Sequence, residues 1–136
     1  MITVIEPGPL TSVQDPFGRV GFRRYGVPVG GAADAWSARL ANLLAGNDET
    51  AAVLEVTLGG LALAVSAPLL VATAGRLAAT LDGTPMPSDS SRTLRPGQRL
   101  RLDPGDGARG YVAFSGGLVV QMVLGSAATD LRTGFG

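Results

Sequence analysis

Residues 11–57 are dense in polar residues that can do chemistry, set among glycines, and read TSVQDPFGRVGFRRYGVPVGGAADAWSARLANLLAGNDETAAVLEVT. Glycine adopts positive φ without strain and lets the backbone come close to a ligand or to another segment. Around this stretch the chain consists mainly of short apolar runs separated by turn residues. We therefore expect this stretch to form the functional site and the surrounding strands to hold it in place.

One part of the stretch, residues 33–45, has the pattern of an amphipathic helix. Its large apolar side chains recur at i, i+4, i+7 and i+8, which predicts a buried stripe made of Trp36, Leu40, Leu43 and Leu44. Asp34 lies where a carboxylate caps the first N–H groups, or alternatively points into a cleft. Gly46 lies where helices end in a left-handed residue.

The rest of the sequence predicts a mainly β fold in a single domain, residues 1–136. Short apolar runs at close spacing favour an antiparallel barrel or sandwich. We expect strands at residues 2–5, 11–14, 53–58, 61–65, 69–73, 78–81, 111–114 and 118–123. Residues 93–102 are expected to form a hairpin around Pro96-Gly97, and the polar segment 84–92 a mobile loop.

The composition excludes several classes of function. Eleven basic and 11 acidic residues give a formal net charge of zero, which argues against a nucleic-acid partner. The chain has no Cys, His or Lys, so thiolate nucleophiles, Cys/His zinc sites, a Ser-His-Asp relay and Schiff bases are excluded. We expect no metal site, and chemistry that relies on Asp, Glu, Arg, Tyr, hydroxyls, amides and the backbone.

No targeting or membrane segment is predicted. The N-terminus has no basic region before its short apolar run, and the longest apolar stretch, residues 61–74, is interrupted by Ser66 and Pro68. We expect a cytoplasmic protein that does not bind a membrane.

Several motifs, taken in order, resemble a known family. They are Thr11-Ser12-Val13-Gln14-Asp15, Gly18-Arg19, Gly26-Val27-Pro28, Gly31-Ala32-Ala33-Asp34, Asn42 with Gly46-Asn47, Leu54-Glu55-Val56-Thr57, Gly110 to Gly117, and Leu124-Gly125-Ser126 with Thr129-Asp130. Together they resemble the 5-oxoprolinase C subunit, also called allophanate hydrolase subunit 2, in a family that includes the carboxyltransferase part of urea amidolyase. The chain departs from the pattern at Pro16-Phe17, and it corresponds to the N-terminal half of the family's C subunit.

The resemblance implies a cyclophilin-like β-barrel and a role in an ATP-dependent 5-oxoprolinase complex, which opens 5-oxoproline to glutamate with the help of a B subunit. The ATP site would lie on the partner or on the other half. One alternative is a carboxyltransferase component that moves a carboxyl group from carboxybiotin to urea or a similar amide. Another is a non-catalytic module that binds and regulates the B subunit. The missing C-terminal half or a second copy would complete the protein, and we expect the isolated chain to be inactive.

The candidate catalytic residues are Asp15, Arg19 and Glu55. An arginine fork can hold a carboxylate or phosphate through two parallel hydrogen bonds, and Asp15 could orient it or accept a proton from an amide nitrogen. Alternatively, Asp15 and Arg19 pair and only fix the glycine-rich loop. Strand alternation places Glu55 on one face with Val53 and Thr57, where it is either an acid/base or ligand-binding group, or an ordinary solvated carboxylate.

The candidate substrate-binding residues are Gln14, Tyr25, Asp34, Asn42, Asn47 and Thr57. Several have a structural alternative. Asn42 would bond the backbone of a neighbouring loop, Asn47 would end the helix, and Tyr25 would lie in a solvated loop with Arg23 and Arg24.

Overall fold

The strands form two antiparallel five-stranded sheets in the computed structural model, which describes residues 1–136. The first sheet runs in the order β1 (Ile2–Pro7), β4 (Leu61–Val65), β9 (Leu100–Asp103), β6 (Ala78–Leu81) and β7 (Thr84–Pro85). The second runs in the order β2 (Leu10–Gln14), β3 (Val53–Thr57), β10 (Arg109–Phe114), β5 (Leu69–Gly75) and β8 (Ser90–Leu94). The predicted mainly β fold is confirmed, and the arrangement is consistent with a cyclophilin-like fold.

The main core lies between the two sheets. Alternate residues of each strand point inward, so Leu63 and Leu100 of the first sheet meet Val112 and Phe114 of the second. Burying a leucine or phenylalanine side chain contributes about 1.5–3 kcal/mol. This apolar layer therefore stabilises the two sheets that position the polar segments.

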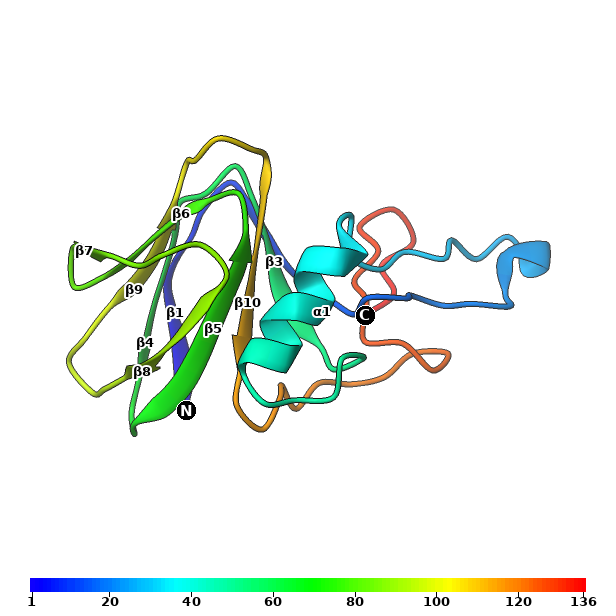
Figure 1. The fold of residues 1–136 in the computed structure, drawn as a ribbon. Coiled ribbons are helices and arrows are strands. Elements are labelled where there is room, and N and C mark those ends of the chain that lie inside the picture. The colour runs from blue at the N-terminus through cyan, green and yellow to red at the C-terminus, as the bar shows by residue number, and fades with distance from the viewer.

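The predicted helix is α1 (Ala35–Leu44), which lies against the outer face of the second sheet, beside β5 and β10 (Figure 1). The prediction of its buried stripe is wrong for Trp36, which is 71% exposed, and for Leu43, which is 58% exposed, whereas Leu40 and Leu44 are partly buried against the cluster beneath the helix. The buried face holds Ala38, Ala41 and Asn42 instead. This stripe has the same helical period, and its small side chains let the helix lie close to Ala72, Ala74 and Ala113 of the sheet.

Two strand predictions are also wrong. The turn at Pro96-Gly97 forms, but β8 pairs with β5 and β9 pairs with β4 and β6, so the connection crosses between the sheets instead of closing a hairpin. The reason is burial, because Leu94 and Leu100 at its two ends are both fully buried in the common core. The segment expected to be a loop, residues 84–92, supplies β7 and the start of β8.

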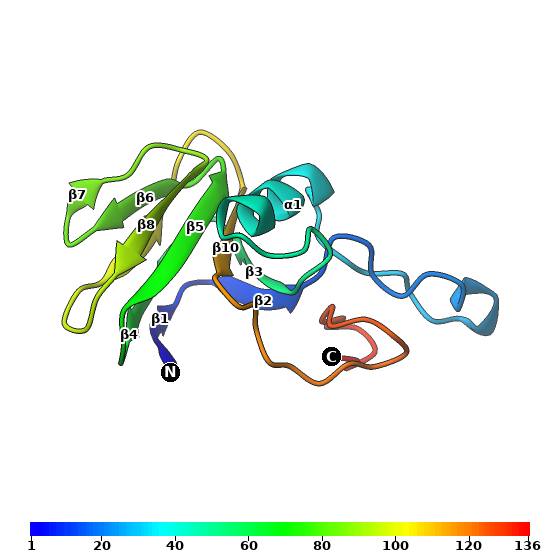
Figure 2. The same cartoon turned by 60° about the horizontal axis from the view of Figure 1, so that its bottom comes forward.

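Residues 118–123 do not form the expected last strand. After β10, a turn at residues 115–117 leads the chain out of the second sheet. The segment that follows, drawn in orange in Figure 2, runs away from both sheets before the tail returns toward β2.

A long arm, residues 16–31, projects from the body between β2 and α1 (Figure 1). A short 3₁₀ helix, η1 (Arg23–Tyr25), forms its tip. At its base, Arg19 N–H donates to the carbonyl of Val29 at 2.6 Å, and Ala32 N–H donates to the carbonyl of Asp15 at 2.8 Å. We call this base, together with the tail residues 123–136 that cover it, the neck.

Candidate functional site

The carboxylate of Asp15 organises the neck. One of its oxygens accepts from the N–H groups of Phe17 and Gly18, at 3.2 and 2.5 Å. The other accepts from the hydroxyl of Ser126 at 2.6 Å and from the N–H of Ala127 at 2.9 Å. Asp15 therefore ties the start of the arm to the tail, and it does not pair with Arg19.

Gly18 lets this turn close. Its φ is +68°, and a Cβ at this position would collide with the carbonyl of Val29. Only glycine fits such a left-handed position at close backbone contact. The two sides of the arm can therefore approach each other beside Asp15 and Arg19.

Arg19 is a buried cation with few partners. Its side chain is among the largest fully buried ones, and the residue is 1% exposed. The Nε–H donates to the carbonyl of Val123 at 3.1 Å, whereas Nη1 and Nη2 have no hydrogen-bond partner. The ring of Phe135 lies over the guanidinium, 5.7 Å from Cζ to the ring centre. Because buried donors without a hydrogen-bond partner cost free energy, the two Nη groups are suited to receive an anionic acceptor.

Gln14 lies beside the same tail. Its Nε2 donates to the hydroxyl of Ser12 and to the carbonyl of Thr129, each at 3.0 Å. Its Oε1 is buried and accepts no hydrogen bond. The neck therefore contains an unused acceptor on Gln14 as well as two unused donor groups on Arg19.

Glu55 belongs to a second buried network, which holds the start of α1. Its Oε2 accepts from the N–H of Ala33 at 2.7 Å and from the hydroxyl of Tyr111 at 2.8 Å. The Tyr111 hydroxyl in turn accepts from the N–H of Asp34 at 2.8 Å, and Arg109 lies 3.6 Å from Glu55. The expected strand alternation is present, since Glu55 and Val53 are buried on the helix-facing side of β3.

This network changes the titration of Tyr111. Burial raises the pKa of Tyr111 well above its ordinary value, and the bond to the neighbouring Glu55 carboxylate raises it further. The phenol is therefore a stable hydrogen-bond donor near neutral pH and is poorly suited to act as a base.

The chain's own side chains hold part of the backbone at the start of α1. Besides the two N–H groups held by Glu55 and Tyr111, the N–H of Ser37 donates to the Asp34 carboxylate at 3.1 Å. Helix N-termini bind phosphate through free N–H groups. The carboxylates of Asp34 and Glu55 lie at the start of α1, and their negative charge disfavours the binding of a nucleoside triphosphate there.

Asn42 and Asn47 connect the end of α1 to its surroundings. Asn42 Nδ2 donates to the carbonyls of Glu49 and Ala51, at 3.3 and 2.8 Å. Asn47 donates to the carbonyl of Phe114 at 2.8 Å and accepts from the N–H of Gly116 at 3.0 Å. Asn42 therefore bonds the backbone of the loop that follows the helix, whereas the side chain of Asn47 joins this loop to the end of β10.

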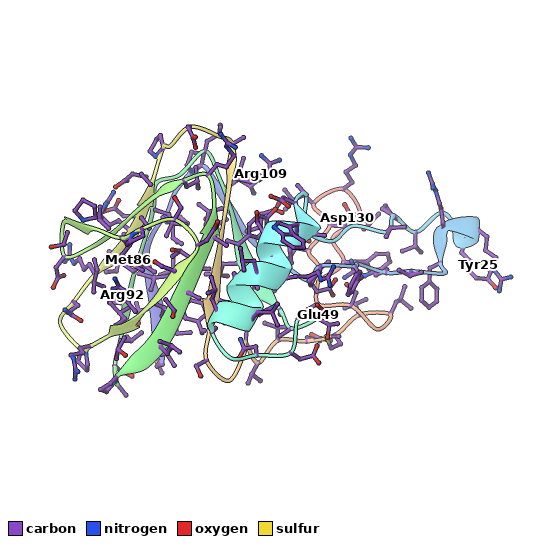
Figure 3. The ribbon with its side chains drawn as sticks, in the orientation of Figure 1. Tyr25, Glu49, Met86, Arg92, Arg109 and Asp130 are labelled. Carbon is purple, nitrogen blue, oxygen red and sulfur yellow. The ribbon has the colours of Figure 1, made fainter.

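The remaining candidates lie apart from the neck. Tyr25 is exposed at the far end of the arm, where Arg24 lies over its ring (Figure 3). Thr57 ends β3 opposite Arg109 and Leu10. The candidate residues therefore separate into the neck, the start of α1, the end of α1 and the tip of the arm.

Sequence reasoning missed two residues that complete these networks. Ser126 stands out in the sequence only as part of the Leu124-Gly125-Ser126 motif, and a short Gly-Ser turn near a polar tail is its only signal. Tyr111 lies directly opposite Glu55 in the register of β3 and β10. That partnership follows from strand pairing, which the local sequence does not specify.

Two further observations concern metal binding and membrane crossing. No group of three or more His, Cys, Asp or Glu residues is placed to hold a metal ion. None of the helices combines the length and the hydropathy that crossing a membrane requires.

In fold class, the protein is a two-sheet domain with an outer helix and a projecting arm. Comparison with known proteins shows the family to which it belongs. The chain matches the family model described as "Carboxyltransferase domain, subdomain A and B" over residues 25–136. It therefore belongs to this carboxyltransferase-domain family.

The relatives include enzymes of two kinds. The chain is 41% identical to the 5-oxoprolinase C subunit of Escherichia coli over all of its own length and 44% of that protein. It is 39% identical to urea amidolyase of Saccharomyces cerevisiae, over 94% of this chain and 7% of that protein. The chain thus spans less than half of either relative.

Two solved structures are also similar to this chain. The crystal structure of TTHA0988 has a TM-score of 0.92 at 41% identity, covering 99% of this chain and 51% of that one. The structure of Kluyveromyces lactis urea amidolyase has a TM-score of 0.89 at 35% identity, covering 94% of this chain and 8% of that one.

Proposed function

We propose that this chain forms part of the C subunit of an ATP-dependent 5-oxoprolinase complex, which acts with a B subunit to open 5-oxoproline to glutamate. Its family membership and its match to the 5-oxoprolinase C subunit along its whole length support this role. Because the chain spans 44% of that relative, we assign the activity to the assembled complex and not to this chain alone.

The observation that carries the proposal is the buried guanidinium of Arg19 with both Nη groups free. 5-Oxoproline bears a carboxylate, and an arginine fork matches a carboxylate with two parallel hydrogen bonds. In a site that excludes water this pair is stronger than at the surface. Arg19 would hold the substrate's carboxylate once the tail around Phe135 moves aside.

Gln14 adds a second point of recognition. The lactam of 5-oxoproline has one N–H donor, and the buried Oε1 of Gln14 is an unused acceptor beside Thr129. Arg19 would bind the carboxylate of the substrate, and Gln14 would bind its lactam N–H. Asp15, whose carboxylate oxygens are engaged by four donors, would act as a positioning residue that keeps this loop in shape.

Ring opening breaks the bond between the lactam nitrogen and its carbonyl carbon. The hydroxyl of water goes to the carbon and a proton goes to the nitrogen. ATP, bound elsewhere in the complex, supplies the free energy for this step. The residues of the neck would orient the substrate and exclude water from its carboxylate.

A second candidate function is the transfer of a carboxyl group from carboxybiotin to urea or a similar amide. The urea amidolyase relatives favour it, and Arg19 would then hold the carboxyl group during transfer. A non-catalytic module that binds and regulates the B subunit is the third candidate. Assays with 5-oxoproline plus ATP, and with carboxybiotin plus urea, distinguish the two enzymes, and absence of both activities from the complete complex would exclude both.

The test replaces Arg19 in the complete complex. Arg19→Gln removes the charge and the fork, so 5-oxoproline-dependent turnover should fall at least about tenfold, equivalent to about 1.4 kcal/mol in barrier. Arg19→Lys keeps the charge without the fork and should retain part of the activity, with a raised KM for 5-oxoproline.

Arg92→Gln is the matched control. Arg92 is exposed on β8, on the side of the body opposite the arm (Figure 3), and its loss should leave turnover unchanged. Wild-type turnover and KM in a folded Arg19→Gln complex would sink the assignment of the neck. Absence of both enzymatic activities from the wild-type complex would favour the regulatory module.

A further inference from the structure

The segment Leu118–Met122 has the sequence of a β-strand and none of its pairing. Four of its five residues are apolar, and two are β-branched valines. Its residues take part in no backbone hydrogen bond within the chain. The side chain of Val119 is fully exposed and Met122 is 57% exposed. An extended apolar segment with free N–H and C=O groups is a ready template for another strand.

An apolar cleft lies next to this segment. Its volume is about 440 Å³, and the segment itself forms one wall. Residues 50–52, Asp15 and Ala127 also line it. In an added strand, alternate side chains point to one face. A strand paired with Leu118–Met122 could therefore place every second side chain in this cleft.

The similar proteins indicate which strand this would be. The chain covers 44% of the Escherichia coli 5-oxoprolinase C subunit and 51% of the TTHA0988 chain, so these proteins contain at least about as much polypeptide again. The formal net charge of zero offers no electrostatic attraction for a strongly charged partner. Apolar packing and backbone pairing are the interactions that the segment and cleft provide.

We propose that Leu118–Met122 pairs with an extended apolar strand from the portion of the family's C subunit that this chain does not cover, and that alternate side chains of that strand fill the adjacent cleft. This is β-strand addition, in which main-chain hydrogen bonds give affinity and side-chain pockets give specificity. The inference specifies a contact within the proposed assembly and does not depend on which reaction the assembly catalyses.

The experiment co-expresses this chain with a polypeptide made of the part of the Escherichia coli 5-oxoprolinase C subunit that lies outside the match. The two should co-purify. In hydrogen–deuterium exchange, the amides of residues 118–122 should exchange rapidly in the chain alone and at least about tenfold more slowly in the complex, as expected when free amides become paired.

Two kinds of variant test the contact. Val119→Pro and Val120→Pro each remove one N–H, and since successive N–H groups point to opposite sides of a strand, one of the two should abolish co-purification. Met122→Asp places a charge in the cleft and should weaken the complex at least about tenfold. Leu43→Asp is its matched control, because Leu43 is equally exposed, at 58%, but lies on α1 outside the cleft.

Failure of the wild-type chains to co-purify, or unchanged exchange at residues 118–122 in the complex, would overturn the proposal. An equal loss of binding in Met122→Asp and Leu43→Asp would also overturn it. If the chain alone forms a dimer in which residues 118–122 are protected, the occupant is a second copy and the proposal is wrong. No outcome relies on turnover, so this inference and the proposed function can fail separately.

Discussion

Glu55 and Arg19 are both buried charged residues, but their surroundings differ in one respect. Glu55 accepts hydrogen bonds from Ala33 and Tyr111 and lies near Arg109. Arg19 has one bonded nitrogen and two that are free. A charge whose bonds are satisfied within the chain supports structure, whereas an unsatisfied one is better suited to binding. This contrast makes Arg19 the stronger of the two candidates for contact with a ligand.

Tyr111 provides a stability test of the network around Glu55. Tyr111→Phe removes the donor to Glu55 and leaves the Asp34 N–H without an acceptor, so the free energy of unfolding should fall by about 1–3 kcal/mol. Urea denaturation at neutral pH measures this loss. Tyr25→Phe, at the exposed tip of the arm, should have no effect; an equal loss in both variants would argue against the network.

The raised pKa of Tyr111 also predicts how stability changes with pH. The folded-state pKa lies above the unfolded value of about 10, so the stabilisation is complete below about pH 10 and is lost as pH rises further. The slope should approach about 1.4 kcal/mol per pH unit between about pH 10 and about pH 11. Tyr111→Phe should reduce that slope and Tyr25→Phe should retain it; an unchanged slope in Tyr111→Phe would contradict the prediction.

At the scale of elements, the packing of α1 shows that two stripes of equal period compete for the sheet. The stripe with Trp36 and Leu43 is more hydrophobic, but the alanine stripe is buried because the facing surface of the sheet is built from small residues and has little room. The large side chains remain on the outer face, where Trp36, Leu40 and Leu43 line a small apolar hollow.

Substitutions in α1 distinguish the two stripes. Trp36→Ala should change the free energy of unfolding by no more than about 0.5 kcal/mol, because the side chain is exposed. Ala41→Leu should destabilise the chain by about 1–3 kcal/mol, because Ala41 is fully buried against the sheet. Thermal denaturation of both variants measures this, and the reverse order would restore the stripe expected from the sequence.

The sequence predicted the elements whose signals are local. The helix, its Asp34 cap and most strands follow from period, turn residues and capping chemistry, and these are properties of a few adjacent residues. The wrong predictions concern which segments pair with one another as strands. Whether residues 93–102 close a hairpin, and whether residues 118–123 find a neighbouring edge, depends on segments far away in the chain.

The same distinction applies to the candidate site. The density of polar residues marked Asp15, Arg19 and Glu55, but their roles depend on distant groups. The partner of Asp15 is Ser126, and the partner of Glu55 is Tyr111. No local pattern joins residues so far apart, so the expected pairing of Asp15 with Arg19 was the simplest local choice and did not form.

At the scale of the whole molecule, several features remain without a partner in the isolated chain. They are the exposed arm, the segment Leu118–Met122 and the free nitrogens of Arg19. Patches of this kind mark surfaces that bind other polypeptides or ligands. These features are available for the contacts that the proposed assembly requires.

This view predicts that the 136-residue chain alone has no 5-oxoproline-dependent ATPase activity. The physical reason is that two carboxylates at the start of α1 disfavour a triphosphate there and that the neck is closed by its own tail. A phosphate-release assay measures this, with the complete Escherichia coli 5-oxoprolinase complex as the positive control. Robust turnover by the purified chain would contradict the prediction.

The bonds that close the neck also determine when it can form during synthesis. Asp15 and Ser126 are 111 positions apart, so at roughly 5–20 residues per second a ribosome needs several seconds to add the second after the first. Until then, one carboxylate oxygen of Asp15 and the base of the arm have no tail to contact. Contacts of such long range also slow folding after release. The neck can therefore mature only after Ser126 has been made, and until then a nascent chain lacks the tail contacts at the base of its arm.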